Sequence, residues 1–158
     1  MHQFTLAELS SHVGQQLGMS DWIEITQAQV QLFADATGDQ QWIHTDPVRA
    51  AAGPFGAPIA HGFLTLSLLP KMFETAFTVS DSRMGVNYGL NKVRFTQPTP
   101  VGAKVRAQFK LLECTPLPSA ADSTAAFSGM HMVVEAQIYR EGSDKPVCVA
   151  ESITRRYA

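Results

Sequence analysis

A carboxylate and an imidazole occur five residues apart in the polar stretch Gly38-Asp39-Gln40-Gln41-Trp42-Ile43-His44. An imidazole takes up or releases a proton near neutral pH, and a carboxylate can share that work or orient a water molecule. On a non-helical connector, Asp39 and His44 could therefore converge on one small molecule. The alternative is a glycine that caps a helix, followed by a solvated turn. Taken alone, the stretch favours this alternative, because loops are polar for ordinary reasons.

A second candidate region is Ile59-Ala60-His61-Gly62-Phe63-Leu64-Thr65-Leu66-Ser67, where a segment rich in Gly and Pro runs into an apolar helix. The first turn of a helix has unpaired N–H groups and a positive dipole end, and Gly62 lets a ligand approach the backbone closely. Such a site suits an oxyanion that develops on a carbonyl group. The alternatives are a glycine needed only for packing and a Ser67 hydroxyl that bonds back to its own helix.

Three further polar residues and patterns are assigned to structure or excluded. Asp46 precedes Pro47, as an N-cap precedes proline at the first helical position, so we interpret it as structural. His44, Asp46 and His61 match no compact zinc spacing and no cysteine joins them, so we predict no metal site. No GxSxG sequence surrounds any serine, which argues against a serine hydrolase.

The elements expected to position these residues are helical in the first half of the chain. Thr5-x-x-Glu8 and Thr26-x-x-Gln29 are capping boxes. The first predicts a helix ending near Gly14 or Gly18, and the second a helix that stops at Gly38. A longer, buried helix is predicted from Gly62 to about Thr78, kinked or broken at Pro70.

From Val86 onward apolar and polar residues alternate, which is the period of strands. The runs Val105–Leu111, Met130–Ile138 and Val147–Ile153 show this alternation, and Glu141–Pro146 predicts a hairpin turn. We expect residues 115–128 to form a loop. Helices followed by antiparallel strands indicate an α+β fold in a single domain, residues 1–158, with a sheet curled around the long helix.

Composition limits the class of protein. The 158 residues carry a net charge of −2, with no cluster of Lys and Arg, so a nucleic-acid partner is not expected. No uninterrupted apolar run reaches the length of a membrane span, and two cysteines without a CxxC pair fit a reducing cytoplasm. Only 16% of residues are charged, which suggests that a partner subunit covers part of the surface.

Three blocks of the sequence are distinctive together: Phe33–Asp46, then Gly53-Pro54-Phe55-Gly56 with Ile59–Ser67, and finally Asn87–Phe95 with Pro98–Gly102. These blocks resemble the MaoC-like dehydratases, specifically the R-specific enoyl-CoA hydratases, and the third block resembles that family's central strand and turn. Matched spacing across three blocks is far more specific than a single Gly-Asp or His-Gly pair.

The resemblance implies a hot-dog fold, an antiparallel sheet wrapped around the central helix, usually in a homodimer. It implies hydration of a trans-2-enoyl-CoA to the (R)-3-hydroxyacyl-CoA without a cofactor, the CoA thioester being the substrate. Asp39 and His44 would activate water and manage the C2 proton, the Gly62 N–H would bind the thioester oxygen, and Ser67 would support the pair. The substrate-binding residues would be Gln41, Trp42, Phe55, His61, Lys92 and Arg94, with Arg49 as a further candidate for the CoA phosphates.

One departure from the family pattern is Gln41-Trp42, where many R-hydratases carry Asn-Pro. Trp42 could line the acyl pocket or simply pack, so chain-length preference does not carry over. Three alternatives stay open: an acyl-CoA thioesterase, a non-catalytic subunit that binds acyl thioesters, and a carrier-protein thioester in place of CoA.

Overall fold

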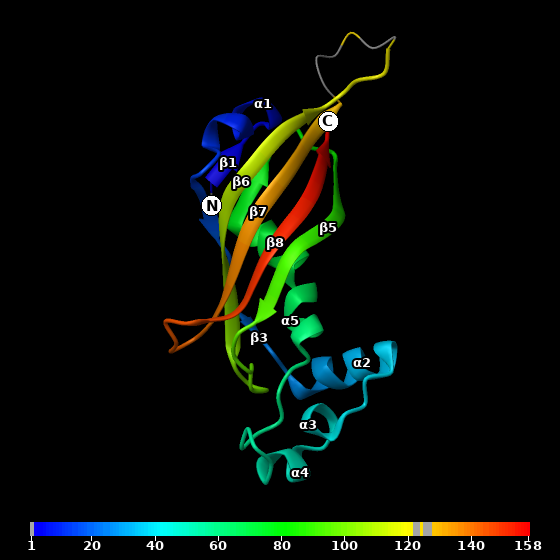
Figure 1. Ribbon diagram of the computed structural model, residues 1–158, viewed down its shortest axis with the longest axis vertical. Helices are drawn as coiled ribbons and strands as arrows, with labels where there is room; N and C mark the ends of the chain where they lie inside the picture. Colours follow the sequence, from blue (N-terminus) through cyan, green and yellow to red (C-terminus); the bar gives the residue numbers. More distant parts are fainter. Residues whose placement is uncertain (1, 122–123, 125–127) are drawn as a thin grey trace.

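The computed structural model describes residues 2–121, 124 and 128–158, and its centre is one curved antiparallel sheet (Figure 1). The strand order is β2-β6-β7-β8-β5, and β3 also pairs with β6. The strands are β2 (Gln16–Met19), β3 (Ile23–Glu24), β5 (Met84–Phe95), β6 (Lys104–Leu117), β7 (Gly129–Arg140) and β8 (Pro146–Tyr157). The predicted α+β class and the hairpin turn before Pro146 are confirmed.

The predicted central helix lies against one face of this sheet and is divided in two, α5 (Gly62–Ser67) and α6 (Leu69–Ala76). Leu68 separates them and Pro70 lies in the first turn of α6, so the expected break near proline is confirmed. Phe73 of α6 stacks on Phe109 of β6 with ring centroids 4.2 Å apart. The expectation that the start of this helix is buried nearly all round is wrong at Phe63, which is 68% exposed.

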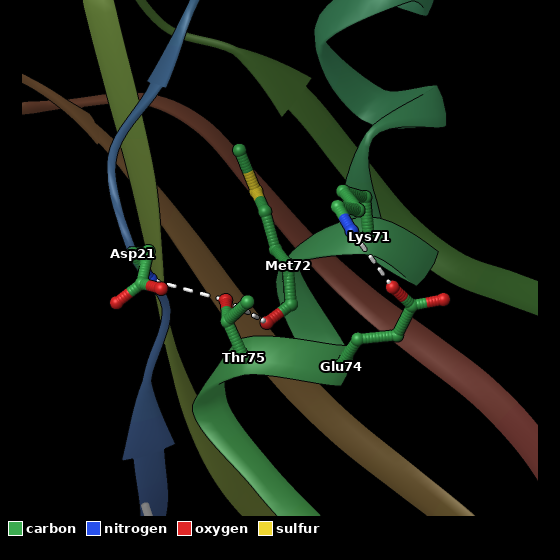
Figure 2. A network of polar contacts seen from close by, with 5 residues as sticks. All are labelled: Asp21, Lys71, Met72, Glu74 and Thr75. Carbon is green, nitrogen blue, oxygen red and sulfur yellow. Dashed lines mark hydrogen bonds and ion pairs between the residues drawn. The ribbon is translucent and has the colours of Figure 1, made fainter.

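Helix α6 makes polar contacts through Thr75 and through the pair Lys71 and Glu74 (Figure 2). The Asp21 N–H, between β2 and β3, donates to Thr75 Oγ1 over 3.1 Å, while Met72 of the same helix is fully buried. Lys71 and Glu74 form an exposed ion pair of 3.0 Å. Such an exposed pair contributes little stability, so burial of the apolar face determines how the helix is placed.

A small helical layer lies beyond one end of the sheet, at the opposite end from α1 (Figure 1). It consists of α2 (Gln27–Thr37), α3 (Trp42–Thr45) and α4 (Pro47–Ala51). The Thr26 capping box and the Asp46 N-cap are both formed, and Gly38 ends α2 with φ 81°. The connector before Asp46, expected to be non-helical, contains the single turn α3, which carries His44.

The remaining elements correct several predictions. The Thr5 capping box is formed, and the helical segment, one turn of α1 (Leu6–Leu9) followed by a 3-10 turn (Ser10–His12), ends near Gly14, which has φ 85°. The other predicted end, Gly18, is wrong, because Gly18 lies in β2 where the chain pairs with β6. A short sheet of β1 (His2–Phe4) and β4 (Phe77–Val79) was not predicted.

Two further corrections concern the strands that follow. The segment Asn87–Phe95, matched to a central strand, belongs to the edge strand β5. Strand β6 extends to Leu117, three residues into the predicted loop. Residues 122–123 and 125–127 of that loop lie outside the described part of the chain. No helix in the described part is long and apolar enough to cross a membrane.

Candidate active site

Three short stretches of chain bring Asp39, His44 and His61 together at the junction between the helical layer and α5. Asp39 follows the C-cap Gly38 of α2, His44 lies on α3, and His61 directly precedes α5. One ligating atom from each side chain lies within 4.8 Å of those of the other two. The convergence of Asp39 and His44 expected from their spacing is therefore present.

His44 is buried, and its hydrogen bond determines which ring nitrogen carries the hydrogen in the neutral ring. Its Nδ1 lies 2.7 Å from the carbonyl oxygen of Ile59. Because a carbonyl oxygen only accepts, Nδ1 must be the donor, and Nε2 of the neutral imidazole is left with a lone pair. The Ile59 N–H in turn donates to the Ile43 oxygen over 3.0 Å, which ties α3 to the segment before α5. His44 can therefore act as a base through Nε2.

Asp39 is exposed, like Asp35 and Asp46 of the same layer, but differs from them because it has almost no local hydrogen-bond partner. Its Oδ1 accepts a long hydrogen bond of 3.4 Å from the Gln41 N–H. Asp35, by contrast, accepts from the amides of Gln40 and Gln31, and these bonds hold its pKa below the ordinary value. Asp46 is occupied as the N-cap of α4. Asp39 is thus the carboxylate of the layer that remains available for chemistry.

A cavity of about 290 Å³ joins His44 to the start of α5. Gly62 is the first residue of α5, so its N–H has no acceptor within the helix. A methyl group on Gly62 would lie 2.8 Å from the ring of Phe95, so a larger residue here would have to displace that ring. The cavity is lined by His44, Phe55, Ile59, Ala60, Gly62, Thr65, Phe95, Thr96, Gln97, Pro98, Thr99 and Val147.

Comparison with known proteins identifies the fold and the family. The sequence model described as "MaoC like domain" matches residues 8–126. The chain belongs to the MaoC-like domain family. It is 50% identical over 154 residues to 3-hydroxyacyl-thioester dehydratase Z of Mycobacterium tuberculosis, which covers 98% of this chain and 97% of the relative. It is 44% identical to Nodulation protein N of Rhizobium leguminosarum bv. viciae, with 98% and 92% covered.

Among solved structures, the unliganded R-hydratase PhaJ1 of Pseudomonas aeruginosa superposes on this MaoC-like chain with a TM-score of 0.71. The two sequences are 25% identical, and the superposition covers 98% of this chain and 86% of the other. The predicted hot-dog fold is therefore confirmed.

Two sequence-predicted residues of this MaoC-like domain lie outside the His44 cavity. Ser67 donates to its own helix at the Leu64 oxygen over 2.7 Å, and it lines a separate cavity of about 430 Å³ between α5 and β5. Trp42 does not line the His44 cavity. The Arg49 guanidinium lies 4.4 Å from its ring centroid, and the ring packs against the Cα of Gly53.

Of the other predicted substrate-binding residues, one lines the His44 cavity and the rest do not. Phe55 lines the His44 cavity. Gln41 contacts Asp39 through its backbone. Lys92 pairs with Glu151 at 3.0 Å, and Arg94 donates to the oxygen of Val93.

Phe95 and Thr65 line the cavity and were not selected from the sequence. Phe95 ends a strand and Thr65 lies in an apolar helical run, so neither residue type stands out by pattern. The only available indication was the proximity of Thr65 to Gly62, one helical turn away.

The Asp39, His44 and His61 cluster is compact enough to suggest a metal site, but the ring geometry does not suit one. The imidazoles of His44 and His61 are stacked, with centroids 3.8 Å apart and planes 26° apart. Their in-plane lone pairs therefore lie in two nearly parallel planes and are poorly placed to point at one ion, whereas zinc needs nitrogen lone pairs that converge at about 2.0–2.1 Å. The arrangement suits proton transfer better than metal coordination.

Proposed function

We propose that this MaoC-family dehydratase reversibly adds water to a trans-2-enoyl-CoA to form the (R)-3-hydroxyacyl-CoA. The observation that carries the proposal is the position of the Asp39 carboxylate beside the buried His44, in a site that opens on the free N–H of Gly62. The names of the relatives, a 3-hydroxyacyl-thioester dehydratase and an R-hydratase, support the same substrate class.

In this mechanism a water molecule is held between the Asp39 carboxylate and His44 Nε2. The pair removes one proton while the water oxygen bonds to C3 of the enoyl group. The C2–C3 double-bond electrons move toward the thioester, whose oxygen becomes negative. The Gly62 N–H donates to that oxygen where charge develops. The proton then returns from the pair to C2, so the elements of water are added and nothing is oxidised or reduced.

The proposed reaction needs no cofactor, because the CoA is part of the substrate. The CoA phosphates require cations on the surface near the cavity mouth. We assign this role to Arg94, which is exposed and adjacent to Phe95, and to Arg49 at the rim of the helical layer. Lys92 is a weaker candidate because its ammonium group already pairs with Glu151.

We further propose that the enzyme is a homodimer in which a second copy covers β5 and α5. The outer edge of β5 pairs with no described strand, and its side chains are exposed or half-exposed along its whole length. The separate cavity that contains Ser67 would then lie between the subunits, near the acyl chain of the substrate.

The direct test is loss of the enoyl-thioester ultraviolet absorbance when crotonyl-CoA is added. We expect hydration by the wild type and a loss of about 100-fold or more in kcat for Asp39→Asn and His44→Ala, the size of a general acid–base contribution. Asp35→Asn is the matched control, since it removes a nearby carboxylate that faces solvent. Coupling to an enantiospecific 3-hydroxyacyl-CoA dehydrogenase determines the configuration of the product.

Four outcomes would contradict the proposal. Wild type without activity on any acyl chain length, or full activity in both site variants, would exclude this hydratase site. Release of free CoA thiol from the same substrate would instead identify a thioesterase. Activity on the acyl-carrier-protein thioester alone would replace CoA as the carrier.

A further inference from the structure

We propose that His61 is a positioning residue that holds Asp39, His44 and the start of α5 in one arrangement. This inference rests on the proposed function and assigns His61 a role other than substrate contact. His61 does not line the His44 cavity, and only 3% of its surface is exposed. Its contacts are instead with the groups that would perform the reaction.

The first contact is a hydrogen bond to the backbone of Asp39. Nε2 of His61 lies 3.0 Å from the Asp39 carbonyl oxygen. The oxygen can only accept, so Nε2 carries the hydrogen and donates it. The two residues are 22 positions apart in the chain. The bond therefore ties the loop that presents the carboxylate to the segment that starts α5.

The second contact is the stack between the rings of His61 and His44, at 3.8 Å between centroids. Phe33 of α2 also contacts the His61 ring, at 5.0 Å between centroids. The His44 imidazole is thus held in its plane by a neighbouring ring as well as by its bond to Ile59. A ring held on two sides loses the freedom to turn away from the water site.

The third contact is through the chain itself. His61 is the N-cap of α5, with non-helical backbone angles of φ −57° and ψ 137°, and its carbonyl accepts from the Thr65 N–H over 3.2 Å. The peptide that follows His61 carries the Gly62 N–H. The orientation of that N–H is therefore coupled to the position of the His61 ring.

A cost to stability supports a functional reason for this imidazole. The other ring nitrogen, Nδ1, is buried and has no hydrogen-bond partner among the described residues. A buried acceptor without a partner destabilises a fold, and an apolar ring of similar shape would avoid that cost. We infer that the position keeps an imidazole for its Nε2 donor.

Two variants separate the ring from the donor. His61→Phe keeps an aromatic ring but has no donor, whereas His61→Gln keeps a donor amide but has no ring. Because misplacing a catalytic group by about 1 Å costs about 100-fold in rate, we expect His61→Phe to lower kcat by about that factor. We expect KM for crotonyl-CoA to stay within a few-fold and the melting temperature not to fall. His61→Gln should recover a large part of kcat.

An NMR measurement tests the same inference without turnover. The backbone amide signals of residues 38–41 and 62 should shift in His61→Phe and return toward the wild-type positions in His61→Gln. His12→Phe is the control, because His12 lies on the 3-10 turn beside α1, at the other end of the molecule (Figure 1). It should change neither the kinetics nor these signals.

The outcomes distinguish failure of this inference from failure of the proposed function. If the wild type hydrates no enoyl thioester, the proposed function fails, and the amide signals still decide whether His61 holds the Asp39 loop. Wild-type kcat or unshifted loop signals in His61→Phe would overturn the inference. Equal losses of kcat in the two variants would also overturn it, since the Nε2 bond would then not be the cause.

Discussion

The two neighbouring imidazoles of this site carry their hydrogens on different nitrogens in their neutral forms, and a backbone carbonyl selects each one. Ile59 fixes the hydrogen of His44 on Nδ1, and Asp39 fixes that of His61 on Nε2. The lone pair of His44 is then on Nε2, while that of His61 is buried on Nδ1. Two residues of the same type, stacked in one site, thus differ in which ring nitrogen can accept a proton, as the roles proposed for them require.

At the residue scale, Gly62 has two proposed roles: its lack of a side chain leaves room for the Phe95 ring, and its backbone N–H donates to the thioester oxygen. Mutation can separate the two. A methyl group at this position would lie 2.8 Å from Phe95, but alanine keeps the backbone N–H. We expect Gly62→Ala to lower kcat/KM by about 100-fold, because the ring and the helix start must move apart and the donor is displaced. The steady-state hydration of crotonyl-CoA measures the loss.

Combining this change with Phe95→Ala is the informative experiment. Removing the ring makes room for the methyl group, so the double variant should approach the activity of Phe95→Ala alone. That single variant is the reference, since Phe95 also lines the cavity. A double variant as poor as Gly62→Ala would show that the steric contact is not the reason for glycine.

At the scale of elements, Asp39 and Asp46 lie on either side of α3 and have different duties. The Asp46 side chain accepts from the Arg49 N–H over 3.0 Å and caps α4. We expect Asp46→Ala to destabilise the protein by about 1 kcal/mol, the usual value of an N-cap. For a chain of this length that lowers the melting temperature by about 2–4 °C. Calorimetry measures the shift.

The conservative change Asp46→Asn provides the control for this cap. Asparagine is nearly as good an N-cap as aspartate, so stability should return while kcat stays at the wild-type level in both variants. Asp39→Asn should show the reverse, with lost turnover and an unchanged melting temperature. Loss of kcat in Asp46→Asn without loss of stability would assign Asp46 to the chemistry.

The same elements show which features local sequence determines. The caps at Thr26, Gly38 and Asp46 were predicted correctly, because each depends on groups within a few residues. The edge position of β5 was missed, since strand order depends on pairing between distant segments. The short β2 strand around Gly18 was missed for the same reason.

The residues of the candidate site also separate into those that local sequence indicates and those that depend on contacts between distant segments. Asp39, His44 and Gly62 were selected by residue type and spacing, and the structure places them at one junction. The contacts of His61 and Phe95 were not predicted, because each joins segments separated by more than fifteen residues and no local pattern encodes such contacts. Ser67 was selected by motif position, yet its hydroxyl bonds to Leu64 within its own helix.

At the scale of the whole molecule, burial of the two cysteines predicts that neither thiol is reactive in the folded protein. Burial raises the pKa of the thiols of Cys114 and Cys148 to about 11. Since the thiolate is the reactive form, neither thiol should react with a thiol reagent at neutral pH in the folded state. Reaction of the half-buried Cys114 should rise only as the pH approaches 11. Both should react at neutral pH after unfolding, and fast labelling of the native protein would contradict this.

The distribution of exposed apolar side chains supports the proposed position of a second subunit. Six of the twelve large exposed apolar residues in the described part of the chain belong to β5 or α5: Met84, Val86, Tyr88, Leu90, Phe95 and Phe63. They accompany an unpaired strand edge, which proteins normally protect because it can pair with another chain. Pairing of this edge with a second copy would cover both features and would account for the low charge of the sequence.

The charge-introducing variant Leu90→Asp tests this arrangement. We expect the wild type to sediment at twice its chain mass of 17.2 kDa and Leu90→Asp to sediment as a monomer, because a buried carboxylate without a partner is strongly unfavourable. Leu32→Asp is the matched control, as Leu32 is 69% exposed on α2 and belongs to neither β5 nor α5. Since Leu90 and Ser67 line the same cavity, the monomer should also lose hydratase activity. A monomeric wild type at micromolar concentration, with full activity, would instead show that one chain contains the complete site.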